Sequence, residues 1–178
     1  MKTIRTKVYQ FSELSAKAKQ YATEKNAETA EYFWSDDAIK SLEGFAEHFG
    51  AKLGRYEIDW TGSFSHSFAT FNTDGIDFED EELKQMVLAM GSYDAETLRG
   101  DGECVFTGYS ADEDAADGAR KAYFEGERDI DTILQAGFKT WLKAAMDDYK
   151  YQLSEEAFNE HCEANEYYFT KDGKRFHQ

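Results

Sequence analysis

The chain has 178 residues, and its 36 acidic and 20 basic side chains give a formal net charge of −16. Apolar residues make up 41% and aromatic residues 16%, so a hydrophobic core is expected and a disordered chain is excluded. The first residues lack the apolar segment of a secretory signal, and no apolar stretch approaches the length of a membrane span. We therefore expect a globular cytoplasmic protein with no membrane association.

The first third of the chain predicts one strand and two helices. Loose alternation of apolar and polar residues predicts a strand over residues 3–11. Ser12 or Ser15 can then cap a helix rich in alanine and lysine. A second helix is expected with Ser35 as its N-cap and with Gly50 in the left-handed conformation that follows many helix C-termini.

The middle of the chain predicts a hairpin, a helix and a short strand. Residues 52–60 and 64–71 alternate in the manner of two strands joined by a turn. An amphipathic helix follows over residues 79–90, with four acidic residues in its first turn. Residues 104–107 are expected to form a short buried strand, and an acidic cluster that begins at Asp112 is expected to open the next helix.

The last third is mainly helical. A continuous apolar stripe predicts a long helix over residues 130–153. Ser154 caps a further helix that ends at Asn165, and residues 166–176 form a hairpin across a Lys-Asp-Gly turn. Because helices and strands intermingle without a linker, we expect a single compact α+β domain of residues 1–178, in which an antiparallel β-sheet packs against several amphipathic helices.

The two cysteines, Cys104 and Cys162, are far apart in the sequence and belong to no CxxC motif. This spacing indicates neither a disulfide framework nor a zinc module. Both are therefore expected to be reduced, buried thiols.

The negative charge is concentrated in one segment. Between Thr61 and Asp131 the chain has 18 acidic and 5 basic residues, whereas residues 1–60 and 132–178 are close to neutral. A concentrated negative field repels nucleic acid and attracts basic surfaces, although acidity can also serve solubility alone. Because duplex DNA carries one charge per about 1.7 Å, the net charge of this segment equals that of about 22 Å of duplex. The expected partner is a protein with a basic nucleic-acid-binding surface, and no direct binding of nucleic acid is expected.

Two acidic clusters in this segment are the candidate partner-binding residues. One opens the helix expected over residues 79–90, and the other opens the helix that follows. Exposed charges contribute little to stability, so reversing the charge of Asp112, Asp114 and Asp117 is expected to abolish binding and leave the fold intact. The candidate residues are Glu79, Asp80, Glu81, Glu82, Asp112, Glu113, Asp114 and Asp117.

No catalytic or cofactor-binding motif is found in the sequence. The nucleophile elbow of hydrolases, the phosphate loop of NTPases, the zinc-protease helix motif and the dinucleotide-binding glycine motif are all absent. The aspartates from Asp112 onward resemble a calcium loop only in part, because Ala116 and Tyr123 occupy positions that require ligands. We predict no catalytic residue, no metal and no cofactor.

An alternative function is that of an enzyme or small-ligand-binding protein with a pocket between the sheet and the helices. Such a site needs polar groups that converge in an apolar cleft, and His66, Tyr109 and His161 are the candidates for it. The neighbours His161 and Cys162 point about 100° apart on a helix, so they do not form a compact zinc site.

Three stretches of the sequence form a recognisable combination. They are residues 8–19 (VYQFSELSAKAK), residues 100–109 (GDGECVFTGY), and residues 149–156 (YKYQLSEE) with residues 163–167 (EANEY). With them the chain resembles, over most of its length, a family of small acidic proteins encoded by bacteriophages and prophages. The resemblance carries no catalytic motif and implies an accessory factor that acts on a host protein. The expected function is a non-enzymatic inhibitor of anti-CRISPR or anti-restriction type that binds its target through a DNA-mimicking acidic face.

Overall fold

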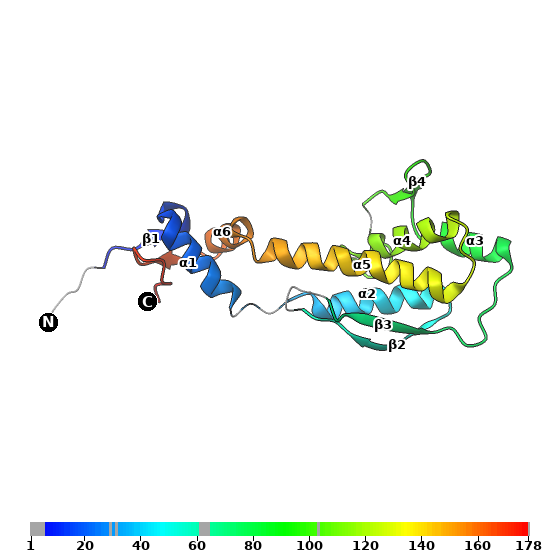
Figure 1. The fold of residues 1–178 in the computed structure, drawn as a ribbon. Coiled ribbons are helices and arrows are strands. Elements are labelled where there is room, and N and C mark those ends of the chain that lie inside the picture. Colours follow the sequence, from blue (N-terminus) through cyan, green and yellow to red (C-terminus); the bar gives the residue numbers. More distant parts are fainter. Residues whose placement is uncertain (1–5, 29, 31, 61–64, 103, 178) are drawn as a thin grey trace. The chain divides into compact units, whose positions relative to one another are not determined.

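Six α-helices and six short strands make up the regular structure in the computed structural model, which describes residues 6–28, 30, 32–60, 65–102 and 104–177 (Figure 1). The strands form three antiparallel pairs among these residues, and the α+β class is therefore confirmed. The chain divides into two compact units, residues 1–31 with 148–178 (unit 1) and residues 32–147 (unit 2). No helix in the described part of the chain is both long enough and apolar enough to span a membrane.

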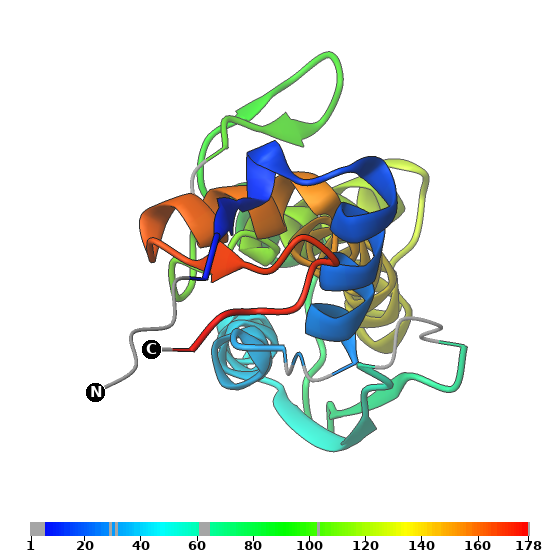
Figure 2. The same cartoon turned by 90° about the vertical axis from the view of Figure 1, so that its left-hand side faces the viewer.

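Unit 1 joins the two ends of the chain. Tyr9 pairs with Phe169 in an antiparallel ladder, and Phe169 also forms a bridge to Arg175 in the predicted tail hairpin (Figures 1 and 2). Helix α1 begins after Ser15, whose side chain accepts a hydrogen bond from the Ala18 amide, as predicted for one of the two candidate serines. The elements of unit 1 are β1 (Tyr9–Gln10), the 3-10 helix η1 (Phe11–Glu13), α1 (Ala16–Ala27), α6 (Glu155–Ala164) and β6 (Tyr168–Phe169).

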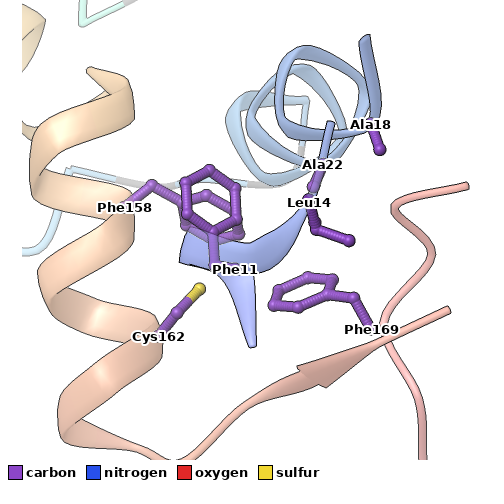
Figure 3. Packing of buried hydrophobic residues seen from close by; sticks show 7 residues of the cluster. All are labelled: Phe11, Leu14, Ala18, Ala22, Phe158, Cys162 and Phe169. Atoms are coloured by element: carbon purple, nitrogen blue, oxygen red, sulfur yellow. The ribbon is translucent and has the colours of Figure 1, made fainter. Parts of the chain in front are cut away.

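Aromatic packing holds unit 1 together. Phe11, Phe158 and Phe169 are buried and meet edge to face, with the centroids of Phe11 and Phe158 only 5.1 Å apart (Figure 3). Ala18 and Ala22 present the buried face of α1 to this cluster, and α1 packs against α6. The small alanine side chains allow a close approach of the two helices, so residues far apart in sequence share one core.

Unit 2 places helices on a β-hairpin. Helix α2 packs against β2 and α4, and α3 packs against α4 (Figure 1). The side chain of Gln135 donates to the carbonyl of Ala69, which ties α5 to β3. The elements are α2 (Ser35–His48), β2 (Lys52–Glu57), β3 (Phe68–Asn72), α3 (Asp80–Leu88), β4 (Tyr93–Asp94), β5 (Arg99–Gly100), α4 (Asp112–Phe124) and α5 (Ile130–Gln152), whose last residues belong to unit 1.

Glycine allows a close contact between two helices in unit 2. A Cβ atom on Gly137 of α5 would overlap the ring of Phe45 and lie 2.8 Å from the carbonyl oxygen of Ala115. A Cβ atom on Gly118 of α4 would likewise lie 2.6 Å from the carbonyl oxygen of Ala136. Helices α4 and α5 therefore cross backbone to backbone, beside the buried side chains of Leu134 and Trp141.

Helix ends mostly agree with the predictions. Gly50 has a φ of 72°, the left-handed conformation predicted after α2. Ser154 caps α6 and Asn165 ends it, as expected. The assignment of Ser35 as an N-cap is wrong, because Ser35 is the first residue of α2 and Trp34 precedes it without a capping side chain.

Three strand predictions need correction or fall partly outside the description. Of the strand expected over residues 3–11, the structure describes residues 6–11, and among these residues 9 and 10 form a strand. The hairpin of β2 and β3 is confirmed, but residues 61–63 of its predicted turn at 60–63 lie outside the described chain. Residues 104–107 form no strand, because the amides of Phe106 and Thr107 donate to the carboxylate of Asp112 and are not free for a ladder. Cys104 is consequently exposed, contrary to expectation, whereas Cys162 is buried.

Candidate functional site

Unit 2 carries nearly all of the net charge. Its sequence has 25 acidic and 10 basic residues, whereas unit 1 has 11 and 10. Between residues 65 and 131, twelve of the described acidic side chains are exposed, against three exposed basic ones, Arg99, Lys121 and Arg128. The exposed acids are Asp74, Asp77, Glu79, Asp80, Glu81, Glu82, Asp94, Glu96, Asp101, Glu125, Asp129 and Asp131.

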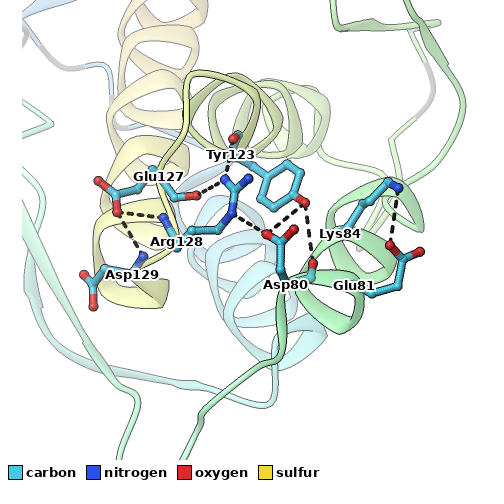
Figure 4. Close-up of polar contacts among 7 residues, drawn as sticks. All are labelled: Asp80, Glu81, Lys84, Tyr123, Glu127, Arg128 and Asp129. Atoms are coloured by element: carbon cyan, nitrogen blue, oxygen red, sulfur yellow. Dashed lines mark hydrogen bonds and ion pairs between the residues drawn. The ribbon is translucent and has the colours of Figure 1, made fainter.

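The first predicted cluster lies on the surface at the start of α3. Glu79 is the N-cap, and the side chains of Glu79 and Glu82 form a capping box that holds the helix start. Asp80 forms an ion pair with Arg128 and accepts a hydrogen bond from the Tyr123 hydroxyl at 3.4 Å (Figure 4). These contacts bring the α4–α5 loop beside α3.

The loop adds two acids that the sequence did not single out. Glu127 accepts hydrogen bonds from the amides of Arg128 and Asp129 (Figure 4). Asp129 caps α5 by accepting a hydrogen bond from the Thr132 amide. We define the acidic patch as Glu79, Asp80, Glu81, Glu82, Glu127 and Asp129. The two cations that lie among these residues are Arg128 and Lys84.

Hydrogen bonding favours the ionised form of two acids in the patch, Glu81 and Asp129. Gln85 and Lys84 both donate to the carboxylate of Glu81, which lowers the pKa of that group. The side chain and amide of Thr132 donate to Asp129 and lower its pKa as well. Glu81 and Asp129 are therefore negatively charged at neutral pH.

The second predicted cluster is not an exposed acidic face. Asp112 has no accessible surface, and its carboxylate accepts hydrogen bonds from the amides of Phe106, Thr107 and Gly108 and from the Ser41 hydroxyl. The assignment of Asp112 to a partner-binding surface is therefore wrong. An acid at the start of a helix was expected to face solvent. The Asp112 carboxylate instead accepts hydrogen bonds from the preceding loop and from Ser41 of α2, and so holds the loop against α2.

Glu113 and Asp117 are half-buried and also serve the loop. Glu113 accepts a hydrogen bond from the Gly102 amide at 2.8 Å, and Asp117 accepts one from the Gly100 amide at 2.9 Å. Asp117 also pairs with Arg120, which is buried and donates to the carbonyl of Met90. Burial raises the pKa of Asp117, and its bonds to Arg120 and Gly100 oppose that rise.

The two predicted clusters lie toward opposite ends of α4. Asp80 contacts Tyr123 near the C-terminus of that helix, whereas Asp112 is its first residue. Eleven residues of α-helix separate these positions, a rise of about 16 Å. The acidic clusters therefore do not merge into one compact site.

Asp114 lines a groove between the β4–β5 hairpin, α4 and α5. The groove has a volume of about 930 Å³, within the size range of ligand sites, and Arg99, Lys143 and Asp147 also line it. Asp114 makes no hydrogen bond or ion pair with any described residue. Burial, with the nearby charges of Asp117 and Glu113, raises the pKa of Asp114 to about 6.

Asp114→Asn is expected to stabilise the protein at neutral pH. A raised pKa means that the folded state disfavours the ionised carboxylate, so the penalty is complete above a pH of about 6 and vanishes below the ordinary pKa of 3.8. We expect a gain of about 1 kcal/mol at neutral pH, a figure kept small because half of the side chain is solvated. Urea unfolding at neutral pH and at about pH 4.5 measures this gain, which should shrink at the lower pH.

Asp77→Asn is the matched control for Asp114→Asn. Asp77 is exposed, and its substitution removes the same charge from unit 2. An equal gain in both variants would mean that general repulsion within the acidic unit, rather than the environment of Asp114, accounts for the effect.

The groove was missed because the sequence does not predict the β4–β5 hairpin. Its turn places Leu98 at a φ of 57°, a conformation usually signalled by glycine or asparagine. Asp94 was the one residue that could have indicated this turn, because its side chain accepts hydrogen bonds from the Glu96 amide and the Thr97 hydroxyl, as turn aspartates do.

The three residues of the alternative pocket are divided between the two units. His66 and Tyr109 belong to unit 2, where His66 is exposed and Tyr109 buried, whereas His161 is exposed in unit 1. None of them lines the groove at Asp114. Within the described ranges, no group of three or more His, Cys, Asp or Glu side chains is placed to hold a metal ion.

The acidic patch and the Asp114 groove are thus the two candidate sites of unit 2, one suited to a basic macromolecule and the other to a small molecule. Comparison with protein-family models, with curated proteins and with solved structures finds no match to this chain.

Proposed function

We propose that this protein is a phage-encoded, non-enzymatic inhibitor that binds the basic nucleic-acid-binding surface of a host defence protein in the bacterial cytoplasm. The observation that carries the proposal is the acidic patch, in which two segments of unit 2 present six acids around two cations. Such a field steers a basic partner at long range and repels nucleic acid. The target is of the CRISPR or restriction type.

Rigid placement of the charges supports this role. The capping box fixes Glu79 and Glu82, and the pair of Asp80 with Arg128 fixes α3 against the α4–α5 loop. Charges that are already in position lose little side-chain entropy on binding. The binding surface is accordingly assigned to Glu79, Asp80, Glu81, Glu82, Glu127 and Asp129, without the α4 residues.

Glu81→Gln with Glu82→Gln is expected to weaken partner binding about fivefold at low salt, since each exposed charge contributes a few tenths of a kcal/mol to about 1 kcal/mol. Glutamine at 82 preserves the capping box, because a carboxamide can also accept the N-cap amide. The partner is first isolated with the tagged protein from host lysate at about 50 mM and about 300 mM salt. A DNA- or RNA-binding complex that is lost at high salt and displaced by competing duplex is the expected result.

The control is Glu43→Gln with Glu47→Gln. Both side chains are exposed on α2 in unit 2, so the variant removes the same charge outside the acidic patch. We expect less than about twofold weakening in this control. Equal weakening in both double variants would mean that net charge, not the patch, determines binding.

The Asp114 groove favours a second candidate function, the binding or turnover of a small ligand. Six acids and three bases line it, so its chemistry suits a cationic group. Recovery of no partner at either salt concentration would move the proposal from the acidic patch to this groove.

A further inference from the structure

A cavity of about 280 Å³ is lined by residues of unit 1. Buried side chains of Ala22, Phe158 and Phe169 line it, and Tyr21 and Tyr167, both half-buried, line it as well. The volume is just below the range of about 300 to 1,000 Å³ that is usual for small-molecule sites. The cavity thus has the size for one small organic molecule.

The polar lining of this cavity is basic. Lys25, Lys174, Arg175 and His177 line it, and no acidic residue does. In a chain with a net charge of −16, a concave site with this lining is distinctive. It selects an anionic ligand.

The turn at Gly173 places two of these cations beside α1. Gly173 has a φ of 87°, and a Cβ atom there would lie 3.0 Å from the carbonyl carbon of Ala18. Only glycine fits this contact without strain. Lys174 forms an ion pair with Asp172 at 3.0 Å, and Lys25 forms one with Glu28 at 2.6 Å. Neither acid lines the cavity.

Arg175 is the cation best prepared to bind an oxyanion. Its guanidinium lies over the ring of Tyr167, 3.4 Å from the centroid, and it forms no ion pair with any described residue. A stacked guanidinium keeps its N–H edge available for two parallel hydrogen bonds to a phosphate. Arg175 is therefore oriented by Tyr167 without being neutralised.

Tyr21 offers an aromatic surface next to these cations. Among the described residues its ring makes no aromatic or cation–π contact, whereas Tyr167 is occupied by Arg175 and His161. Stacking of a base on a tyrosine ring contributes to affinity whatever the base. Tyr21 thus supplies a second recognition element, a ring on which a base can stack, which inorganic phosphate cannot use.

We propose that this cavity binds a mononucleotide, with the phosphate on Arg175, Lys174 and Lys25 and the base on Tyr21. The site belongs to unit 1 and does not depend on the function proposed for the acidic patch.

Calorimetric titration of the full chain with AMP, adenosine and inorganic phosphate at about 50 mM salt tests the proposal. AMP is expected to bind at least about tenfold more tightly than either of its parts, because only AMP engages both recognition elements. Arg175→Gln is expected to weaken AMP binding about tenfold, and Tyr21→Leu severalfold.

Lys17→Gln is the matched control, because it removes one positive charge, as Arg175→Gln does. Lys17 is exposed on α1 and does not line the cavity. Circular dichroism confirms that each variant is folded, and Lys174→Gln provides a second test of the phosphate contact. Equal affinity for AMP and phosphate, equal weakening by Lys17→Gln, or no AMP binding at about 5 mM would each overturn the proposal.

Discussion

Replacing Asp112 with alanine is expected to destabilise unit 2 by about 2 to 4 kcal/mol, because one buried hydroxyl and three part-buried amides lose their acceptor together. The amides of Phe106, Thr107 and Gly108 point at one carboxylate oxygen, at 3.1, 2.7 and 3.1 Å, and the Ser41 hydroxyl points at the other. Asp112→Asn is expected to lose less, since its carboxamide oxygen can still accept from the loop amides.

Urea unfolding followed by tryptophan fluorescence measures this loss. Trp34, Trp60 and Trp141 all belong to unit 2, so the signal reports on that unit alone. Hydrogen exchange should also accelerate at the amides of residues 106–108, which depend on Asp112. Asp77→Asn, which removes an exposed charge, is expected to change stability by less than about 0.5 kcal/mol. A loss below about 1 kcal/mol in Asp112→Ala would show that the loop does not depend on this carboxylate.

The burial of Asp112 changes how partner binding must be tested. Reversing the charge of Asp112, Asp114 and Asp117 was expected to leave the fold intact because the three charges were taken to be exposed. That premise does not hold, because Asp112 is buried and Asp117 accepts hydrogen bonds from Arg120 and from the Gly100 amide. Loss of binding in that variant would reflect unfolding as much as lost contacts. Charge changes at Glu81 and Glu82 separate these effects, because both side chains are exposed.

Local signals in the sequence predicted the helices well. The apolar stripe of α5 and the serine caps of α1 and α6 depend on residues within a few positions of each other, so they can be recognised without tertiary contacts. The hairpin of β2 and β3 and the left-handed Gly50 were predicted for the same reason.

The candidate sites depend on contacts between distant residues, and the sequence predicted them less well. Glu81 and Asp112 each lie in an acidic run in the first turn of a helix. Glu81 is exposed, whereas Asp112 is buried and accepts a hydrogen bond from Ser41, which is 71 residues away in the sequence. The cavity of unit 1 likewise joins Tyr21 to Arg175, from the two ends of the chain. Neither arrangement has a periodic pattern, because only tertiary packing creates it.

Gly137→Ala is expected to destabilise unit 2 by about 2 to 3 kcal/mol, although alanine usually favours a helix over glycine by about 1 kcal/mol. The added methyl group would overlap the ring of Phe45, which is fully buried, and would lie 2.8 Å from the carbonyl oxygen of Ala115. The ring is confined by Phe49, Phe71 and Phe106, and the carbonyl belongs to the backbone of α4, so neither neighbour can move aside alone. Steric overlap therefore outweighs the gain in helix propensity, and α4 must shift away from α5.

Gly44→Ala in α2 is the control for this argument, because its new Cβ atom would lie 3.1 Å from the Cβ atom of Phe106. That contact is tight but requires a shift of only a few tenths of an ångström, so we expect a change within about 1 kcal/mol of zero. Urea unfolding of both variants compares the two contacts directly. If Gly137→Ala were as stable as the parent protein, α4 and α5 would not be locked at this crossing. The Asp114 groove, which Gly118 and Thr140 line at the same crossing, would then be free to widen.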